Sequence, residues 1–426
     1  MVRCYIVIVL AAGFSLTACG GASNGAFAPR IPATSVRHLS DVLYSFGAFG
    51  DAQYPFGGLL AGRKGEYYGT SQGGGSEGYG SVYEITASGK EQVLYSFQGA
   101  PDGADLTSTL VMDKQGVLYG TTVAGGASGC GGPGCGTAFK LTPNNQGWGE
   151  SVLYRFQDGS DGGAPIGGLV MTKSGALLGT TYSGGSGGGV VFELTPSGST
   201  YTETVVHTFS GSPDGLNPEA GLASDSSGNL YGTTNSGGLG SGTIFELMAS
   251  GSTDSYSVIY RFKGGPRDGS QPTSNLLPGP NGTFYGLTSE GGRKGKGTVF
   301  ELAPKGSAYR EKLLYSFKGG VDGAHPRDVP GLAADRDGDL YGTTLNGGGA
   351  RHCKFGCGTL FKLVASGNGY TKQLLYAFQG HGGDGANPLG GVIIDRHGNL
   401  LGPTFMGGSA RSGTIYSICC APPPQR

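Results

Sequence analysis

The amino-acid sequence predicts an all-β fold, a seven-bladed β-propeller of four-stranded antiparallel blades. Three observations support it: a motif that recurs seven times, a spacing of 51 to 61 residues between copies, and four strand-like segments in each copy. A four-stranded sheet cannot bury both faces alone, so the copies are expected to stack side by side around a ring. A parallel β-helix is the alternative, but its coils are shorter and these copies carry antiparallel hairpin signals.

The first strand-like segment of each copy is Val-Leu-Tyr-Ser-Phe or a variant. It begins at Val42, Val93, Val152, Val205, Val258, Leu313 and Leu374. Its alternation of β-branched and aromatic residues favours a strand over a helix. The chain enters the repeats on this segment and leaves them at residues 413–416, the last segment of the last copy and the third strand of its blade. We therefore expect the first segment (residues 42–46) to pair with the last copy and close the ring.

The rest of each copy follows a fixed order. An Asp lies 9 or 10 positions after the start, at Asp51, Asp102, Asp161, Asp214, Asp268, Asp322 and Asp384. A strand such as residues 168–171 comes next, and then a Tyr-Gly or Leu-Gly pair at Tyr68, Tyr119, Leu178, Tyr231, Tyr285, Tyr341 and Leu401. The last segment, Gly-Thr-Val-Phe or a relative, begins at Gly80, Gly136, Gly189, Gly242, Gly297, Gly358 and Gly413.

Composition argues against disorder. Gly (88) and Pro (22) are abundant, but 37% of the 426 residues are hydrophobic, only 14% are charged, and there are 22 Tyr and 19 Phe. Such a chain has enough apolar material for a core. The net charge is −1, so there is no overall basic field of the kind that binds nucleic acid.

The N-terminus indicates export. Arg3 and the apolar residues 5–14 are typical of a secretory signal, too short for a stable membrane anchor. Leu-Thr-Ala-Cys at residues 16–19 resembles the lipobox of bacterial lipoproteins, which would make Cys19 the lipidated N-terminus; an ordinary cleavage site is the alternative. We thus divide the chain into a signal (1–18), a flexible lipid-anchored tether (19–40), the propeller (41–420) and a Pro-rich tail (421–426).

One repeat resembles a known family. Residues 229–247 read Asn-Leu-Tyr-Gly-Thr-Thr-Asn-Ser-Gly-Gly-Leu-Gly-Ser-Gly-Thr-Ile-Phe-Glu-Leu, which looks like the GloVer tandem repeat of bacterial surface or secreted proteins that use one of several anchors. The resemblance covers nearly all of residues 42–418. It implies a location outside the cytoplasm, with Cys19 as the anchor, and carries no established activity. Ser71, Leu178, Leu287 and Pro403 depart from the pattern, so individual strand contacts are expected to differ.

Six cysteines remain beyond Cys4 and Cys19. The loop between the Tyr-Gly pair and the Gly-Thr-Val-Phe segment is longest in the second and sixth copies. These loops carry Cys130 with Cys135 and Cys353 with Cys357. We expect each pair to form a disulfide within its loop. A zinc site of all four is the alternative, but the two loops belong to distant blades. The sequence leaves the state of Cys419 and Cys420 open.

The repeated Asp permits two interpretations. Because the loop that contains it and the Gly-Gly loop must emerge on one face, seven Asp could form a ring of carboxylates for calcium or for sugar hydroxyls. A single ligand site on a ring of copies needs residues that differ between blades, however, whereas this Asp is present in every copy. We therefore expect it to hold the turn of its own loop. Asp335 to Asp339 resembles an EF-hand start, but Leu340 and Asn346 stand where Gly and Glu are needed, which favours a hairpin turn.

Charge is distributed unevenly between the copies. Residues 1–257 contain 10 basic and 19 acidic residues and residues 258–426 contain 19 and 11, so the two parts carry −9 and +8. Basic residues expected on the loop face are Arg267, Arg293, Lys294, Lys296, Arg327, Arg351, Lys354 and Arg411, with His325, His352 and His381 nearby. They form a candidate patch for an anionic glycan, a lipid head group or an acidic partner; an ordinary solvated surface is the alternative.

Enzyme signatures are missing. The sequence contains no Gly-x-Ser-x-Gly elbow, His-Glu-x-x-His or phosphate-binding loop, and it predicts no cofactor and no metal. Two carboxylates facing each other across a central channel could hydrolyse a glycoside, but no pair is singled out. The sequence therefore favours a lipid-anchored binding or scaffold module of the cell envelope, with a propeller hydrolase or polysaccharide lyase as the alternative. A glycan or a protein is the expected partner, besides the membrane reached through the lipid.

Overall fold

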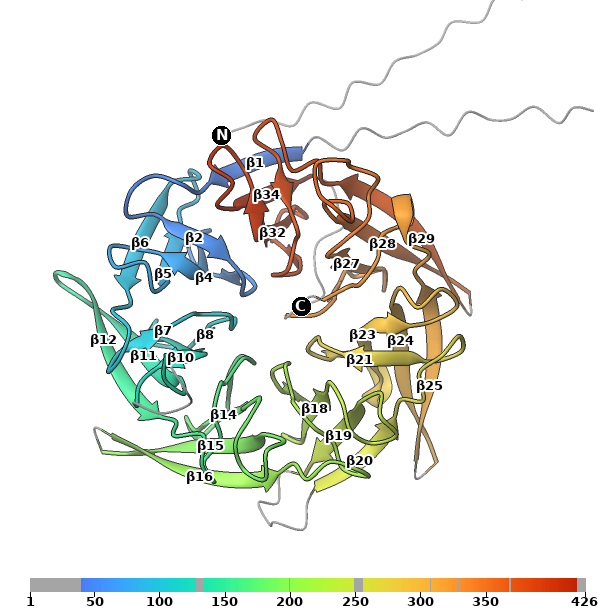
Figure 1. Cartoon of the computed structure of the whole chain (residues 1–426), viewed down its shortest axis with the longest axis horizontal. Coiled ribbons are helices and arrows are strands. Elements are labelled where there is room, and N and C mark those ends of the chain that lie inside the picture. Colours follow the sequence, from blue (N-terminus) through green and yellow to red (C-terminus); the bar gives the residue numbers. More distant parts are fainter. Residues whose placement is uncertain are drawn as a thin grey trace, which may run out of the picture. The chain divides into compact units, whose positions relative to one another are not determined.

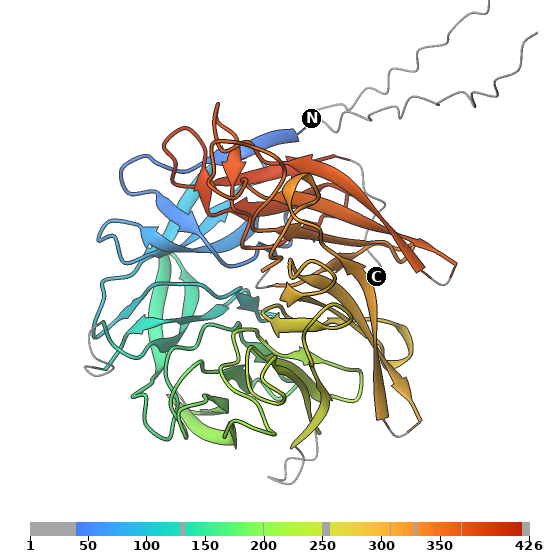
Figure 2. The same ribbon diagram turned by 45° about the vertical axis from the view of Figure 1, so that its right-hand side comes forward.

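The computed structural model describes residues 40–127, 133–198, 200–248, 256–306, 308–327, 330–367 and 369–419. Within them, seven antiparallel sheets stand as blades around one axis (Figure 1), and Figure 2 shows the same ring turned by 45°. The described part consists of strands and loops with two 3-10 turns, η2 (Pro280–Gly282) and η3 (Gly320–Asp322). It includes no helix of a length and apolarity that could cross a membrane. The predicted seven-bladed, four-stranded propeller is confirmed.

Each blade takes its three inner strands from one copy of the repeat and its outer strand from the next copy. From the inside outwards, blade 1 contains β3 (Leu60–Ala61), β4 (Tyr67–Gly74), β5 (Ser81–Ile85) and β6 (Glu91–Ser96); blade 2 contains β8 (Val111–Met112), β9 (Leu118–Thr122), β11 (Thr137–Asn144) and β12 (Gly147–Arg155). Blade 3 contains β13 (Val170–Met171), β14 (Leu177–Thr180), β15 (Val190–Ser197) and β16 (Thr200–Thr208); blade 4 contains β17 (Ala223–Ser224), β18 (Leu230–Thr234), β19 (Thr243–Leu247) and β20 (Tyr256–Arg261).

The remaining blades follow the same order. Blade 5 contains β22 (Leu277–Pro278), β23 (Phe284–Gly291), β24 (Thr298–Lys305) and β25 (Ala308–Ser316); blade 6 contains β26 (Ala333–Ala334), β27 (Leu340–Thr344), β28 (Thr359–Ser366) and β29 (Gly369–Ala377); blade 7 contains β31 (Ile393–Ile394), β32 (Leu400–Thr404), β34 (Thr414–Ile418) and β1 (Ser40–Ser45). Short additional strands are β2 (Ala52–Pro55), β7 (Gly103–Ala104), β10 (Ala124–Gly125), β21 (Gly269–Pro272), β30 (Gly385–Ala386) and β33 (Met406–Gly407).

The ring closes between the two ends of the repeat region. Strand β1 pairs antiparallel with β34, from Ser40 opposite Ile418 to Ser45 opposite Thr414. This pairing completes blade 7 with a strand from the first copy, as the order of segments predicts. It removes the free edge that blade 7 would otherwise present.

Aromatic pairs join the blades. The Phe of each Val-Leu-Tyr-Ser-Phe segment is fully buried and packs against an aromatic ring on the third strand of the following blade, with centroids 4.9 to 5.3 Å apart. The pairs are Phe46 with Tyr83, Phe97 with Phe139, Phe156 with Phe192, Phe209 with Phe245, Phe262 with Phe300, Phe317 with Phe361, and Phe378 with Tyr416. The seven copies thus preserve one residue because it seals the same interface seven times.

The Gly of the Tyr-Gly pair makes room for these rings. A Cβ atom added at Gly232 would lie 2.3 Å from the Phe245 ring, closer than any non-bonded carbon can approach. A side chain at this position of the second strand would therefore displace the ring that joins the blades.

The chain segments that lead into the inner strands contact segments of other blades. A Cβ added at Gly167 would lie 2.6 Å from the Ala220 carbonyl oxygen, and one at Gly58 would lie 2.7 Å from the Pro330 ring. Asn275 Oδ1 accepts a hydrogen bond of 2.7 Å from the Gly221 amide. One expectation is corrected: the strand expected over residues 168–171 is limited to Val170–Met171.

The disulfide expected in the long loop of the sixth copy is present between Cys353 and Cys357, with an S–S distance of 2.03 Å. Cys135 is disulfide-bonded, whereas its expected partner Cys130 lies outside the described residues. Cys419 is also disulfide-bonded.

Several other expectations fall outside the described part. Cys420, the signal, Cys19 and most of the tether belong to the residues that the structure does not describe. The predicted lipid anchor therefore stays a prediction.

Candidate functional site

One face of the ring brings two loops of every copy together. In each copy, the segment after the repeated Asp pairs with the end of the second strand. The paired residues are Ala52 and Gly74, Gly103 and Gly125, Gly163 and Ser183, Leu216 and Ser236, Gly269 and Gly291, Ala324 and Asn346, and Gly385 and Gly407. We call this side the loop face, and the shared location is the one that chain direction predicts.

The repeated Asp holds the loop in which it lies. Asp161 accepts hydrogen bonds from the Tyr154 hydroxyl at 3.1 Å and from the Gln157 amide at 2.9 Å. The same pair of donors, seven and four positions earlier, serves Asp102 and Asp322, and His207 replaces the tyrosine at Asp214. Among the described residues there is no cluster of three or more potential metal ligands. These carboxylates thus act within their own loops.

A second carboxyl lies beside four of these Asp residues, at the junction between neighbouring blades. Burial, followed by the negative charge of the nearby Asp, raises the pKa to about 7 in Glu91, Glu150, Glu203 and Glu311. The corresponding residue in blade 6 is Lys372, whose Nζ lies 3.0 Å from Asp322 Oδ1. At one junction an ion pair compensates for the cost of burying a charge. At the other four, the raised pKa favours the neutral carboxyl.

Three positions on the loop face differ from copy to copy. They are the third and fifth residues after the repeated Asp and the residue that directly follows the Tyr-Gly-Thr-Thr segment. The third residue is Tyr54, Asp105, Ala164, Asn217, Gln271, His325 and Asn387 in successive copies, and each has a φ between 52° and 62°. Left-handed backbone in residues other than Gly is costly, and in every copy the amide of this residue donates to a carbonyl oxygen of the preceding blade, so the backbone is shared and only the side chain varies. These positions are the ones that a ligand can distinguish.

A recess of about 360 Å³ opens on this face across blades 4, 5 and 6. Its lining consists mainly of the variable positions of three consecutive copies: Glu219, Asn235, Gln271, Thr273, Ser289, His325, Arg327 and Leu345, with Glu290 and Asn346. We call it the polar recess. Hydrogen-bond donors and acceptors from three blades converge there, which is typical of a site that recognises a polar ligand.

An ion pair spans the polar recess. Arg327 Nη2 of blade 6 lies 2.9 Å from Glu219 Oε2 of blade 4. The Asn235 side-chain amide donates to Glu219 Oε1 at 2.8 Å. The Glu219 carboxylate is nearly buried, whereas the Arg327 side chain is 46% exposed. Arg327 therefore keeps N–H donors directed at solvent while its charge stays compensated.

Blade 5 contributes neutral hydrogen-bonding groups. The Ser289 hydroxyl donates to the Gln271 carbonyl oxygen at 3.2 Å. His325 Nδ1 lies 3.0 Å from the Ser289 carbonyl oxygen. Because a carbonyl oxygen only accepts, Nδ1 carries the proton, and Nε2 is the acceptor in the neutral ring. The buried Thr273 hydroxyl has no partner among the described residues.

The predicted basic patch divides into parts. Only Arg327 and His325 line the polar recess. His352 and His381 contact each other, with ring centroids 3.9 Å apart, and Lys354 Nζ lies 5.2 Å from the Phe355 ring centroid. Arg293 and Lys294 are exposed on one loop with the half-buried Lys296, and Arg267, Arg351 and Arg411 are exposed on three others.

Sequence reasoning missed the neutral and acidic members of the polar recess. Glu219, Asn235, Gln271 and Ser289 carry no motif of their own. The signal that would have found them is their variation between copies whose neighbouring residues repeat.

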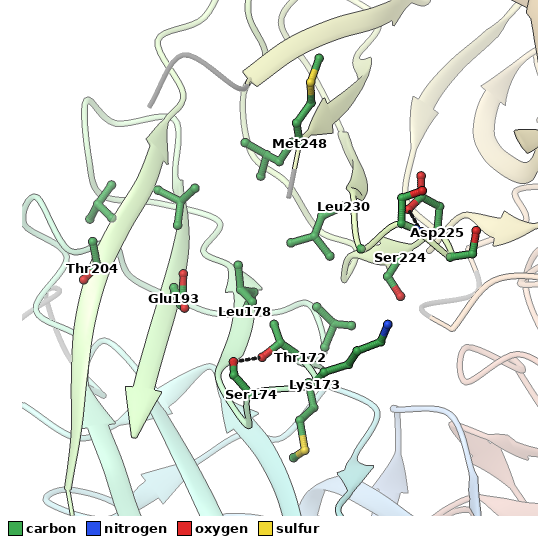
Figure 3. A pocket seen from close by; sticks show the side chains of 18 residues that line it. Thr172, Lys173, Ser174, Leu178, Glu193, Thr204, Ser224, Asp225, Leu230 and Met248 are labelled. Carbon is green, nitrogen blue, oxygen red and sulfur yellow. Dashed lines mark hydrogen bonds between the residues drawn. The ribbon is translucent and has the colours of Figure 1, made fainter. Parts of the chain in front are cut away.

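A larger recess of about 700 Å³ lies on the opposite face, between blades 3 and 4 (Figure 3). Leu178, Leu230 and Met248 contribute apolar walls. Its polar groups serve local turns: Thr172 and Ser174 join their hydroxyls at 2.8 Å, and Asp225 accepts from neighbouring amides.

In other blades an aromatic side chain lies near the corresponding place. In four blades an aromatic residue four positions before the Val-Leu-Tyr-Ser-Phe segment packs against the preceding blade; Trp148, for example, meets Tyr68 with centroids 6.2 Å apart. In blade 4 that position is Asp254, which lies outside the described residues. We therefore place the candidate site at the polar recess.

Fold and site together define a repeat-built β-propeller with a polar recess on its loop face. The chain belongs to the Gloeobacter/Verrucomicrobia repeat family, whose model matches residues 127–352 and 240–422. A search of curated proteins found no match.

Solved structures share the fold. The extracellular domain of a putative one component system from B. thetaiotaomicron matches with a TM-score of 0.56 and 11% identity, over 89% of this chain and 40% of that chain. A putative oxidoreductase (glucose dehydrogenase) from Thermus thermophilus matches with 0.41 and 16%, over 90% and 100%. An ulvan lyase, a polysaccharide lyase, matches with 0.45 and 9%, over 88% and 95%. At these identities the likeness concerns the fold alone.

Proposed function

We propose that this protein is an exported, lipid-anchored binding module of the bacterial cell envelope, and that it holds a glycan in the polar recess of its loop face. Export and attachment through Cys19 rest on the signal-like N-terminus. Binding rests on one observation: the recess is built from the positions at which otherwise repeated copies differ. A ligand that fits there meets a combination of side chains that occurs once on the ring.

The chemistry of the polar recess suits sugar hydroxyls. A hydroxyl both donates and accepts, and Glu219, Asn235 and Gln271 supply acceptors and donors from three directions. The ion pair between Arg327 and Glu219 leaves further N–H groups for a ligand oxygen. Charge-assisted hydrogen bonds of this kind are the stronger ones.

The exposed basic loops have a separate role in this proposal. Arg293 and Lys294 are exposed near the polar recess, in the loop that links β23 to β24, with Lys296 half-buried beside them. Positive charge there attracts an anionic polymer from a distance and makes its capture sensitive to salt.

A glycan array tests the proposal, followed by titration calorimetry with the full chain purified in detergent. Arg327→Ala is expected to weaken glycan binding about 10- to 100-fold, the range that loss of a charged hydrogen bond implies. Arg267→Ala is the matched control, because it removes an exposed arginine of the same face outside the recess. Equal affinity of both variants and the wild type would place binding elsewhere.

Two further readouts separate the alternatives. Reversal of Arg293, Lys294 and Lys296 to Glu is expected to remove the salt dependence of binding to acidic glycans, while neutral glycans keep their affinity. Release of new reducing ends or unsaturated products in the same samples would instead assign the loop face to a hydrolase or lyase. Absence of any glycan binding would contradict the proposed function.

A further inference from the structure

The polar recess continues along the ring in both directions through two asparagines. Asn217 and Asn387 occupy the same position of the fourth and seventh copies, third after the repeated Asp. The Asn217 side-chain amide donates to the Tyr182 carbonyl oxygen at 3.0 Å, and that of Asn387 donates to the Leu345 carbonyl oxygen at 3.0 Å. Asn217 thus ties blade 3 to blade 4, and Asn387 ties blade 6 to blade 7.

An aromatic residue follows at each end. Tyr182 lies next to Asn217 at one end. At the other end, the Phe405 amide donates to the Asn387 carbonyl oxygen at 3.0 Å. Tyr182 and Phe405 both occupy the position directly after the Tyr-Gly-Thr-Thr segment, the position that Asn235 and Ser289 occupy inside the recess. Equivalent backbone therefore presents aromatic rings on both sides of a polar centre.

The end at blade 7 is extended by the first copy. The Phe405 ring lies 5.4 Å from the Tyr54 ring and 6.0 Å from the Phe56 ring, between centroids. All three rings are half-buried and none belongs to a hydrophobic core cluster. They form an aromatic group on the surface where the ring closes.

One feature distinguishes the tyrosines among these rings from the structural aromatics. It is not the φ of Tyr54, because this position is left-handed in all seven copies and its amide donates to a loop of the preceding blade, for Tyr54 to the Ser412 carbonyl oxygen at 2.8 Å. The hydroxyls of Tyr54 and Tyr182 form no hydrogen bond to any described residue, whereas the tyrosines of the repeated segment, such as Tyr95 and Tyr154, donate to the Asp of their loop. Hydroxyls without a partner among the described residues are available to a ligand.

We propose that these residues form one continuous binding arc for an extended polysaccharide, with sugar rings stacked on Tyr182 at one end and on Phe405 with Tyr54 at the other. This inference rests on the proposed function and names its ligand class: a polymer bound through several consecutive sugar units. A pyranose has an apolar C–H face and a polar rim, so it uses an aromatic platform and a polar recess together. The arc follows five neighbouring blades, from blade 3 through blades 4 to 6 to blade 7, and reaches the first copy.

Chain length is the variable that tests this inference. Calorimetry uses the full chain with ladders of alginate, homogalacturonan and β-1,3-glucan, each from disaccharide to octasaccharide. Affinity for the ladder that binds is expected to rise with length until the arc is covered. Phe405→Ala and Tyr182→Ala are each expected to weaken octasaccharide binding about tenfold and disaccharide binding less than twofold, whereas Arg327→Ala weakens all lengths.

The controls keep the outcomes separate. Phe355→Ala removes an exposed ring of the same face, 68% exposed, and is expected to leave every length unchanged. Phe405→Leu keeps apolar volume but removes the aromatic face, so it reports on stacking if Phe405→Ala unfolds. An affinity that does not depend on length, or variants equal to the wild type on the octasaccharide, would overturn the arc alone. A wild-type chain that binds no ladder would overturn the proposed function, and the arc with it.

Discussion

The blade bodies and the loop-face arc use the same seven copies in opposite ways. In the bodies, each copy repeats one Phe, one second-strand Gly and one third-strand aromatic, because each blade must seal against its neighbour. In the arc, the corresponding positions hold different side chains on a backbone that repeats down to its left-handed φ. Packing between blades therefore requires the same residues in every copy, whereas recognition of one ligand depends on residues that differ between copies.

The largest expected effect lies in the bodies. Phe192→Ala removes a fully buried ring that packs on Phe156, and we expect it to lower the free energy of unfolding by about 3–5 kcal/mol. Leu239→Ala, at an exposed residue, is the control and should change stability by less than about 0.5 kcal/mol. Denaturant unfolding measures both. Equal stability of the two variants would contradict the assignment of Phe192 to a tightly packed interface.

The junction carboxyls predict a pH effect of intermediate size. Burial raises the pKa of Glu203 to about 7 in the folded protein, from an ordinary value of 4.5. Its stabilising contribution is therefore complete below the ordinary value and is lost as the pH rises through about 7. Glu203→Gln is expected to reduce the loss of thermal stability between about pH 5 and about pH 8. The exposed Glu77→Gln should leave that loss unchanged, and an identical pH profile for all three proteins would refute the prediction.

The smallest expected change in the free energy of unfolding lies in the arc, and it is an increase. Gln271 has a φ of 56°, so Gln271→Gly relieves strain and should raise the free energy of unfolding by roughly 0.5 kcal/mol after the entropy of Gly is deducted. Glycan affinity should fall, because the side chain lines the recess. Gln72→Gly, which lies in β4, is the control and should destabilise the fold. Loss of stability in both variants would show that Gln271 serves the fold.

Much of the fold was predictable from the sequence because seven copies of a segment give a stronger strand signal than one copy. One Val-Leu-Tyr-Ser-Phe segment is a weak strand signal, whereas seven at similar spacing specify a blade, its neighbours and the closure through β1 and β34. The short inner strands were less predictable. Their preceding glycines meet segments from other blades at the ring centre, and such contacts carry no periodic pattern.

The candidate site was only partly predictable. Charge pointed to Arg327 and His325, and both line the recess. Glu219, the partner of Arg327, lies 108 positions before it. No local sequence pattern connects two residues so far apart.

The sequence by itself determined the number of copies, the order of strands and which residues repeat, because every blade interface needs the same residues. The tertiary structure alone decided that variable residues of neighbouring copies meet in one recess flanked by aromatic rings. The physical reason is that a ring places equivalent positions of consecutive copies side by side. Which of those positions touch depends on how tightly the blades pack around their axis.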